Sequence, residues 1–343
     1  MAKVLCINVR GKIMNKSLGI YNIVYNKEIN KSIENVLKSN INFNTYTTPK
    51  GLKELRIEIC KFLYRIWNYK TNYNNMLITT GSQQSINLIS SSLINDKDVI
   101  IIEQPTYFGA LEVFKKRNIK LVGINLKKNG LNLKELEKKI IKYSPKLIYV
   151  VPTFNNPTGY SWSNKKRKEF LKIINKYNIL VLEDDPYSLI NFTKTKYKSL
   201  YTLNNGKRII YLGTFSKLIS PSINVGYILS DKINLLFSYK KSFDLCTNTF
   251  SQYIVLDYLK NNRLEKIIKY KIYFYKKALK NTIKELNNNY KNQIIKITKP
   301  KGGMFFLIKF KNKINLEDFE DGSKYYINGN HTNITRINIC YRL

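Results

Sequence analysis

The middle of the chain alternates short apolar runs with longer amphipathic segments, and this alternation limits the choice of fold more than any other feature. Segments with helical periodicity lie at 83–94, 106–117, 132–143 and 164–177. Apolar runs of strand length surround them at 76–82, 98–105, 119–126, 146–152, 179–185, 208–214 and 225–230. Runs that are apolar throughout are typical of parallel strands buried on both faces. The sequence therefore predicts an α/β fold with a mixed, mainly parallel seven-stranded sheet flanked by helices.

The rest of the chain predicts a second, smaller α+β unit. Residues 249–289 have a helical pattern, and residues 293–310 read as two strands on either side of Gly302 and Gly303. No internal repeat is present. We expect a large domain over residues 46–274 and a small domain that combines residues 1–45 with 275–343.

The charge of the chain is strongly positive, with 59 basic and 23 acidic residues and a net charge of +36. Most of the basic residues are lysine rather than arginine, which is the better fork for phosphate. They are interleaved with Asn, Ile and Tyr, which share AT-rich codons with Lys. Base composition is therefore the favoured explanation, and a functional polyanion surface is the alternative. Weak, salt-sensitive binding to nucleic acid is expected, without sequence specificity.

Several classes of chemistry are disfavoured by composition. His331 is the only histidine, so a Ser–His–Asp triad or a His-rich metal site is excluded as the main chemistry. The four cysteines are far apart in the sequence, which predicts neither a disulfide framework nor a zinc site. No apolar run is long enough to span a bilayer, and the first residues lack the apolar core of a signal peptide. We expect a cytoplasmic protein that binds no metal and no membrane.

Polar residues come directly after several of the predicted strands. Because the carboxyl ends of parallel strands meet at one edge of a sheet, these residues are expected to converge. One is a glycine–serine pair at the start of a helix, where backbone N–H groups and the helix dipole favour an anion. The set consists of Gly81 and Ser82, Asn156, Asp184, Tyr187, and Lys217 with Thr214 and Ser216 just before it.

This combination of groups suits one cofactor, pyridoxal phosphate (PLP). An acid can pair with the pyridine nitrogen, hydrogen-bond donors can hold the ring oxygen, and a helix start can hold the phosphate. A lysine can condense with the aldehyde to form a Schiff base. The three-residue step from Asp184 to Tyr187 favours Asp184 over Asp185 as the ring-nitrogen partner.

The ordered motifs resemble those of a known family. They are "TTGSQQ", "EQPTYFGALEVF", "PTFNNPTG", "EDDPY", "TFSK" followed by Pro and "GY", "KGGMF" and "TRINI", and they cover roughly residues 40 to 340. The chain resembles the class I/II aminotransferases, which are PLP-dependent enzymes of fold type I. The details are most similar to the 2-aminoadipate/kynurenine aminotransferase subgroup, which also supplies the effector domain of some transcription regulators.

The resemblance implies a role for each residue at the centre of the site. Lys217 would be the catalytic residue, forming the Schiff base and then moving a proton from the substrate α-carbon. Asp184 would keep the pyridine nitrogen protonated. Tyr187 and Asn156 would hydrogen-bond the ring oxygen, and Tyr107 would stack on the ring.

The resemblance also implies the residues around the phosphate and the substrate. Arg336 would bind the substrate α-carboxylate. Tyr46 would reach the phosphate of a neighbouring subunit, which implies a homodimer. The remaining phosphate contacts would come from Gly81, Ser82, Gln83, Thr214 and Ser216.

The chain departs from the family pattern at two places. Members of this subgroup usually carry an arginine seven residues after the lysine, where this chain has Asn224, and Ser222 stands where glycine is usual. Weaker cofactor binding is therefore expected. The stretch between "GGMF" and Arg336 and the stretch after Arg336 are both shorter than usual, so a reduced small domain is expected.

The leading interpretation is an aminotransferase that moves an amino group between an amino acid and a 2-oxo acid in amino-acid biosynthesis. A PLP-dependent lyase or decarboxylase and a decayed or repurposed aminotransferase fold with weak PLP binding remain alternatives. A regulator is disfavoured because the 45 residues before Tyr46 show no helix-turn-helix pattern. The amino donor stays open.

Overall fold

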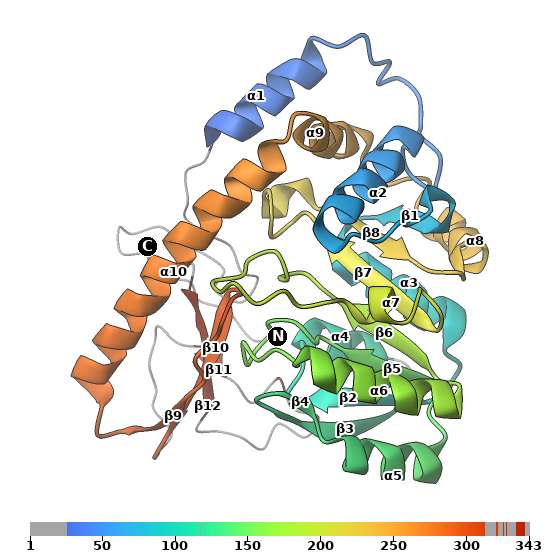
Figure 1. The fold of residues 1–343 in the computed structure, drawn as a ribbon. Helices are drawn as coiled ribbons and strands as arrows, with labels where there is room; N and C mark the ends of the chain where they lie inside the picture. Colours follow the sequence, from blue (N-terminus) through green and yellow to red (C-terminus); the bar gives the residue numbers. More distant parts are fainter. Residues whose placement is uncertain are drawn as a thin grey trace.

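A computed structural model describes residues 26–116, 118–312, 320–321, 325, 327 and 334–339. Its large sheet has the strand order β1-β8-β7-β6-β5-β2-β3-β4 (Figure 1). Strand β8 is antiparallel to β1 and β7, and β4 is antiparallel to β3, whereas all other pairs are parallel. The bounds are β1 (Met76–Thr79), β2 (Val99–Gln104), β3 (Lys120–Lys127), β4 (Gly130–Leu131), β5 (Leu147–Val150), β6 (Leu180–Asp184), β7 (Ile209–Thr214) and β8 (Gly226–Leu229).

This arrangement confirms the mixed, mainly parallel sheet and its seven predicted strands. The two-residue strand β4 is an addition that the sequence did not indicate. It forms a hairpin on the outer edge of β3, where Leu131 pairs with Leu126. A strand of two residues is too short to show a period of hydrophobicity, so sequence patterns do not detect it.

Helices cover both faces of the large sheet, and each face has its own core. Along β5, Leu147 and Tyr149 point to one face while Ile148 and Val150 point to the other. The first face is covered by α3 (Gly81–Leu93), α4 (Phe108–Lys115) and α8 (Ile233–Phe243). The second is covered by α2 (Lys53–Trp67), α5 (Leu133–Tyr143), α6 (Asn164–Tyr177), α7 (Leu200–Leu203) and α9 (Thr249–Lys260).

The asparagine-rich sequence supplies many of the helix ends. The side chains of Asn132 and Asn248 accept hydrogen bonds from the first turns of α5 and α9, which are ordinary N-caps. Asn68 and Asn178 adopt the left-handed conformation that ends α2 and α6. Asn262, also left-handed with φ 50°, divides the predicted 249–289 helix into α9 and α10 (Arg263–Tyr290).

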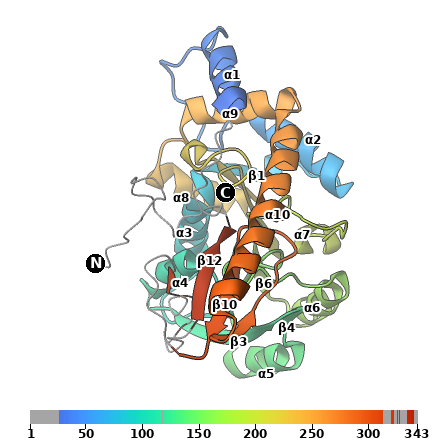
Figure 2. The ribbon, with the colours of Figure 1, turned by 90° about the vertical axis from the view of Figure 1, so that its left-hand side faces the viewer.

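A second, antiparallel sheet has the strand order β11-β12-β10-β9. Helix α10 lies across it, as both ribbon views show (Figure 1 and Figure 2). The predicted strands on either side of Gly302 and Gly303 are confirmed as β9 and β10. The bounds are β9 (Ile294–Ile297), β10 (Phe305–Phe310), β11 (Glu320–Asp321) and β12 (Ile334–Asn338), and short 3₁₀ turns lie at Tyr73–Asn75 and Pro221–Ile223.

The expected domain division remains a prediction. Helix α10 continues through residues 274 and 275, where we expect the boundary. Helix α1 (Asn26–Leu37) packs on α9, and Ser32 and Asn35 both donate hydrogen bonds to Asp257 of that helix. The predictions that concern residues 1–25, Cys6, His331, Cys340 and Leu343 lie outside the described residues.

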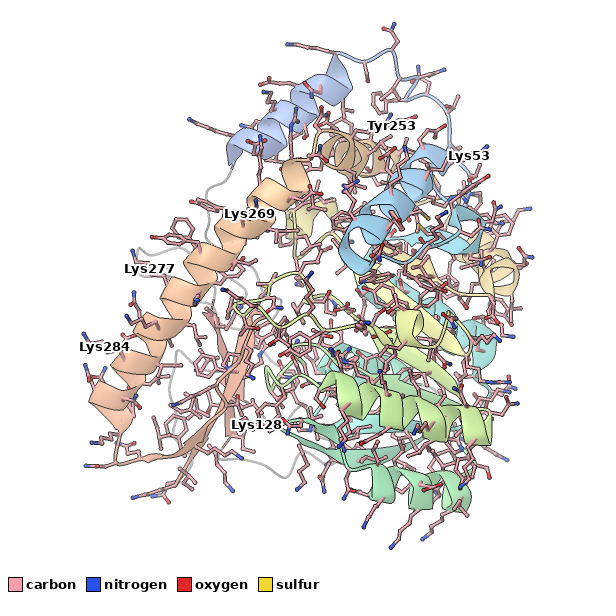
Figure 3. The ribbon with its side chains drawn as sticks, in the orientation of Figure 1. Lys53, Lys128, Tyr253, Lys269, Lys277 and Lys284 are labelled. Carbon is pink, nitrogen blue, oxygen red and sulfur yellow. The ribbon has the colours of Figure 1, made fainter. Side chains whose placement is uncertain are left out.

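None of the helices in the described part combines the length and the apolarity needed to cross a membrane. The lysines labelled in Figure 3 project outward from separate elements: Lys53 from α2, Lys128 from the turn after β3, and Lys269, Lys277 and Lys284 from α10. Within the described ranges, no group of three or more His, Cys, Asp or Glu side chains is arranged to hold a metal ion.

Candidate active site

A cavity of about 290 Å³ lies at the carboxyl ends of the parallel strands. Strands β1, β2, β5, β6 and β7 all end beside it, as expected for a ligand site in an open α/β sheet. Ten of the predicted residues line it: Gly81, Ser82, Gln83, Tyr107, Asn156, Asp184, Tyr187, Thr214, Ser216 and Lys217. Val151, Pro186, Pro221, Asn224 and Phe305 complete the lining. Residues as far apart in the sequence as Gly81 and Phe305 are therefore brought to one cavity.

Asp184 is the last residue of β6 and is buried, with only 2% of its surface exposed. Its Oδ2 accepts a hydrogen bond of 2.8 Å from the hydroxyl of Tyr149 on the adjacent strand β5. Its Oδ1 is buried and has no hydrogen-bond partner among the described residues. Burial raises the pKa of this carboxyl to about 7. A buried oxygen without a partner, on a residue that lines a cavity, suits a cationic N–H donor from a ligand.

The neighbouring acid, Asp185, is engaged elsewhere. Its two oxygens accept hydrogen bonds from the backbone N–H of Ser188 at 3.1 Å and from the hydroxyl of Tyr211 at 2.9 Å. Asp185 is absent from the lining of the cavity, whereas Asp184 belongs to it. The geometry therefore separates the two acids in the way that the sequence spacing favours.

The start of α3 forms one wall of the cavity. Gly81 has a φ of 71°, and a Cβ there would lie 2.4 Å from Oδ1 of Asn224, so the backbone conformation and the packing both require glycine. The hydroxyl of Ser82 is buried without a hydrogen-bond partner in the described structure. Backbone N–H groups at a helix start, together with a hydroxyl whose hydrogen bonds are unused, are suited to bind an anion.

Two other predicted phosphate residues have partners within the chain. The hydroxyl of Thr214 donates to the carbonyl of Val225 at 3.3 Å and accepts from the backbone N–H of Ser216 at 3.2 Å. The side chain of Gln83 donates to the carbonyl of Gly109 at 3.0 Å and accepts from the hydroxyl of Tyr107 at 3.2 Å. Gln83 therefore fixes the direction of the Tyr107 ring, whose pKa is raised to about 12, mainly by burial.

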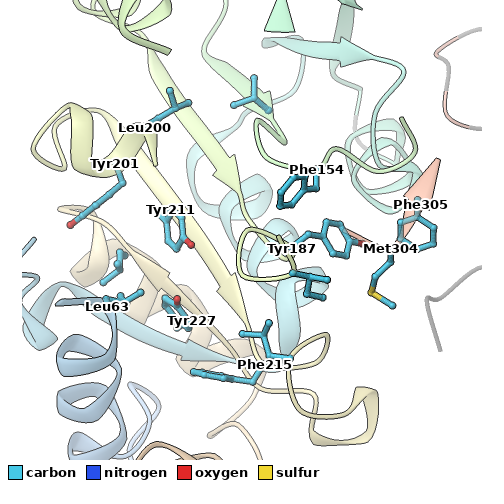
Figure 4. Packing of buried hydrophobic residues seen from close by; sticks show 14 of the residues in the cluster. Leu63, Phe154, Tyr187, Leu200, Tyr201, Tyr211, Phe215, Tyr227, Met304 and Phe305 are labelled. Carbon is cyan, nitrogen blue, oxygen red and sulfur yellow. The ribbon is translucent and has the colours of Figure 1, made fainter. Parts of the chain in front are cut away.

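Tyr187 and Asn156 lie on the opposite wall and connect it to the small sheet. Tyr187 is 4% exposed, and burial raises the pKa of its phenol well above the usual value, so it stays protonated and able to donate. Its ring meets that of Phe305 edge-on at 5.8 Å (Figure 4). Asn156 accepts a hydrogen bond of 3.2 Å from Nη1 of Arg336 on β12.

Arg336 does not belong to the cavity lining but lies directly behind it. The side chain is 1% exposed, and its guanidinium lies over the rings of Phe305 at 4.2 Å and Tyr325 at 5.1 Å. Its positive charge acts on both Tyr107 and Tyr187, against the effect of burial on their pKa values. The small sheet thus places the guanidinium of Arg336 next to the cavity.

Tyr46, like Arg336, is a predicted residue that does not line this cavity. The residue is 79% exposed. A contribution to the site of its own chain is therefore not seen. The exposed position is compatible with a contact to a second chain.

Lys217 lies three residues beyond the end of β7, in a tight turn. The backbone N–H groups of Leu218 and Ile219 both donate to the carbonyl of Phe215, at 3.1 and 2.7 Å. Lys217 is half-buried and lines the same cavity as Asp184 and Ser82. The unused Asp184 oxygen, the unused Ser82 hydroxyl and this lysine together fit the ring nitrogen, phosphate and aldehyde of PLP.

Sequence reasoning missed the buried acid that holds one wall of the site. Glu103 of β2 accepts hydrogen bonds from the backbone N–H of Val151 at 2.7 Å, from Asn155 at 3.1 Å and from the Trp162 indole at 2.9 Å. Burial raises the pKa of Glu103 to about 7. The three donors lie on the loop that carries Asn156. A charged residue inside an otherwise apolar strand is the sequence signal that could have indicated such a role.

A mixed, mainly parallel sheet that brings an acid, a helix start and a lysine to one cavity is the arrangement of the fold-type I aminotransferases, whose solved structures this fold matches. The family model described as "Aminotransferase class I and II" matches residues 17–341, and the chain belongs to this family. The chain is 36% identical over 267 residues to "Aromatic-amino-acid aminotransferase 1" of Thermococcus litoralis, covering 76% of this chain and 64% of that protein. It thus spans just under two thirds of that relative's length.

Two further proteins support the same assignment. The chain is 27% identical over 311 residues to a "2-aminoadipate transaminase" of Thermus thermophilus, covering 85% of this chain and 76% of that protein. The solved structure of Pyrococcus horikoshii kynurenine aminotransferase, described in complex with PMP, superposes with a TM-score of 0.87 at 29% identity. That superposition covers 94% of this chain and 85% of the other. These findings confirm the expected family, fold class and subgroup.

Proposed function

We propose that this protein is a PLP-dependent aminotransferase that transfers an amino group between an amino acid and a 2-oxo acid, with Lys217 as the Schiff-base residue. The main supporting observation is that Lys217 and Asp184 line the same cavity, where one Asp184 oxygen has no hydrogen-bond partner within the described structure. The family uses PLP, and both side chains have the chemistry that PLP requires.

Each group of residues at the cavity has a defined task in this proposal. When bound, PLP withdraws electrons from the substrate α-carbon and so makes its proton removable. Asp184 would ionise to hold a protonated ring nitrogen. Tyr187 and Asn156 would hold the ring oxygen through hydrogen bonds, and Tyr107 would lie against the ring. The phosphate would be held by the α3 start at Gly81, Ser82 and Gln83, and by Thr214 and Ser216.

Lys217 and Arg336 act on the substrate. The Lys217 amine would bind the cofactor through its aldehyde. As a free amine it would take up the proton that leaves the substrate α-carbon and hold it for return. Arg336 binds the α-carboxylate through its guanidinium fork. Its hydrogen bond to Asn156 keeps the fork near the ring-oxygen side of the cavity.

The first amino donors to test are aromatic amino acids. The cavity is walled by Tyr107, Val151, Tyr187 and Phe305, which present mainly apolar surface. A relative at 36% identity is an aromatic-amino-acid aminotransferase. Aminoadipate and kynurenine follow from the other relatives. We place the reaction in cytoplasmic amino-acid biosynthesis.

We propose a homodimer as the working assembly. Leu235, Tyr239 and Phe243 form a stripe on one side of α8 and are 43%, 39% and 57% exposed. Exposed apolar side chains at this spacing mark a surface that another protein covers. In a homodimer, the exposed side chain of Tyr46 would be available to contact the active-site cavity of the partner chain.

The proposal is tested by locating the lysine that reacts with PLP. The protein is mixed with PLP, reduced with borohydride and digested, and the modified peptide is identified by mass spectrometry. We expect the adduct on the peptide containing Lys217, its loss in Lys217→Ala and its retention in Lys53→Ala, which changes a surface lysine of α2. An adduct that is absent at high PLP concentration would leave a decayed or repurposed aminotransferase fold.

The reaction type is decided by the products formed from the positive amino donors. An aminotransferase converts the bound cofactor to its pyridoxamine form and releases the 2-oxo acid. Release of carbon dioxide without the pyridoxamine form would instead indicate a decarboxylase. Release of ammonia with turnover and without an acceptor would indicate a lyase.

A further inference from the structure

Lys271, in the first half of α10, is a buried lysine whose amine is directed at the turn that carries Lys217. Only 1% of the residue is exposed. Its Nζ donates hydrogen bonds to three consecutive backbone carbonyls, those of Lys217 at 3.1 Å, Leu218 at 2.7 Å and Ile219 at 2.9 Å. An ammonium group has three donors, and here all three are used on one turn.

Both the backbone N–H groups and the backbone carbonyls of this turn therefore have hydrogen-bond partners. Its N–H groups at Leu218 and Ile219 bond to the carbonyl of Phe215 within the turn. Its carbonyls have their partner in Lys271, 52 to 54 positions later in the sequence. Without that amine, buried carbonyls next to Lys217 would lose a charged donor, and the turn could change its backbone direction.

The other deeply buried lysine of the described structure, Lys240, has a different kind of partner. Lys240 of α8 is 0% exposed, and its amine forms an ion pair with Asp244 one turn later in the same helix. Lys240 thus neutralises a local carboxylate. The hydrogen bonds from Lys271 to the carbonyls of residues 217–219 instead join two distant segments, α10 and the turn after β7.

Helix α10 also contacts the small sheet, which gives the Lys271 bonds a wider consequence. Tyr275, Ala278 and Leu286 of α10 belong to the same packed core as Phe306 and Ile308 of β10. Strand β10 pairs with β12, which carries Arg336. One helix therefore fixes both the lysine turn and the sheet that supplies the carboxylate-binding arginine.

We propose that Lys271 is a positioning residue that fixes the backbone of Lys217 so that the Lys217 amine is directed at the cofactor aldehyde. This inference rests on the proposed function, because it assigns Lys217 its Schiff-base role. Lys271 acts only through the backbone of Lys217 and touches neither cofactor nor substrate. Its loss should therefore affect the covalent bond to the cofactor and leave non-covalent binding intact.

The test compares two forms of the cofactor that differ in one group. PLP has the aldehyde that condenses with Lys217, whereas pyridoxamine phosphate has an amine there and binds only non-covalently. Dissociation constants of both are measured for the wild type and for Lys271→Met, which keeps an unbranched side chain and removes the charge. Leu286→Ala, a buried truncation on the same helix about 22 Å further along, is the stability-matched control.

We expect Lys271→Met to weaken PLP binding by about tenfold or more while pyridoxamine phosphate binding changes by less than about threefold. The rate at which borohydride traps the adduct on the Lys217 peptide should fall in parallel with PLP affinity. Leu286→Ala should lower the melting temperature without changing the ratio of the two affinities. If Lys271→Met does not fold, Lys271→Gln retains one donor group and is measured in the same way.

Two results would overturn the inference. Equal losses of PLP and pyridoxamine phosphate affinity would reduce Lys271 to a residue needed for the fold. An unchanged ratio in a folded variant would show that Lys217 is positioned without Lys271. Failure of the proposed function looks different, because the wild-type protein itself would then show no adduct on Lys217.

Discussion

Asn224 occupies the place beside the anion-binding wall where the resemblance leads one to expect an arginine. Its φ is 45°, a left-handed conformation that asparagine tolerates better than most residues. Its side chain lies against Gly81 and lines the cavity with Ser82 and Thr214. The site thus offers the phosphate hydroxyls and backbone N–H groups, and Asn224 adds no charge.

Replacing Asn224 by arginine should strengthen phosphate binding. A charge-assisted hydrogen bond contributes about 1.5–3 kcal/mol, whereas a left-handed non-glycine residue costs roughly 1 kcal/mol, so we expect affinity for PLP to rise about tenfold. The melting temperature should fall slightly. Titration of pyridoxamine phosphate with Asn224→Arg measures the gain without the covalent bond. Asn224→Ala removes the asparagine without adding charge and should bind no more tightly than wild type.

Asp184 makes the stability of the cofactor-free protein depend on pH. Burial raises its pKa from 3.8 to about 7, so the folded state keeps a proton that the unfolded state releases between these values. The stabilisation is complete below about pH 4 and is lost as the pH rises to about 7. In Asp184→Asn this loss is absent. The free energy of unfolding of the variant, relative to that of the wild type, should therefore rise with pH by roughly 4 kcal/mol at most.

Urea unfolding of the cofactor-free wild type and Asp184→Asn at pH 5, 6, 7 and 8 checks this expectation. The other buried acids with raised pKa values, Glu103, Glu183 and Asp185, are present in both proteins, and their contributions cancel in the difference to a first approximation. A difference that stays constant over this range would contradict the raised pKa of Asp184.

At the scale of elements, one carboxylate of α9 contacts both α1 and α10. Asp257 of α9 accepts hydrogen bonds from Ser32 and Asn35 of α1 and from Arg263 at the start of α10. Arg263 also lies 3.7 Å from Glu28 of α1. The distant helix α1 and the consecutive helices α9 and α10 therefore meet at a largely buried ion pair.

Removing this carboxylate should release α1. In Asp257→Ala the buried Arg263 loses its closest anion, which costs about 3–5 kcal/mol of unfolding free energy. Hydrogen exchange should show the loss of protection concentrated in residues 26–37. The control is Glu265→Ala, which breaks the solvent-exposed pair with Arg65 and should cost less than about 1 kcal/mol. Uniform loss of protection over the whole chain would contradict a local role for Asp257.

The elements show which information the sequence contains and which it lacks. Strand β5 is apolar throughout and β6 is apolar up to its two final acids, so both strands are visible in the sequence. The polar residues at or after the strand ends could be placed at one edge of the sheet. The partners of those residues depend on contacts between distant segments. Tyr149 on Asp184, Glu103 on Trp162 and Lys271 on the Lys217 turn have no local pattern, so only the structure reveals them.

At the scale of the whole molecule, the lysines behind the net charge of +36 are distributed along the sequence rather than clustered in one segment. Lysines on α2, α10 and the turn after β3 project in different directions (Figure 3). A nucleic-acid site would instead concentrate arginine and aromatic residues in one groove. The distribution supports base composition as the origin of the charge.

The assembly is the last property to predict, and the exposed stripe of α8 is where we expect two chains to meet. Its buried side, including Leu236 and Lys240, packs inward, so Leu235, Tyr239 and Phe243 are left for a partner. Changing Tyr239 and Phe243 together to glutamate places two like charges on each of two facing surfaces. We expect the double variant to elute as a monomer, with its mass measured by light scattering.

The matched control is Ile141→Glu, because Ile141 is 65% exposed on α5, on the other face of the large sheet. It should leave the dimer intact. We propose that Tyr46 reaches the phosphate site of the partner chain, so the monomeric variant should also bind pyridoxamine phosphate more weakly, as should Tyr46→Phe in the intact dimer. A double variant that remains dimeric would place the interface elsewhere. A monomer with unchanged affinity would show that Tyr46 contributes nothing to the partner's site.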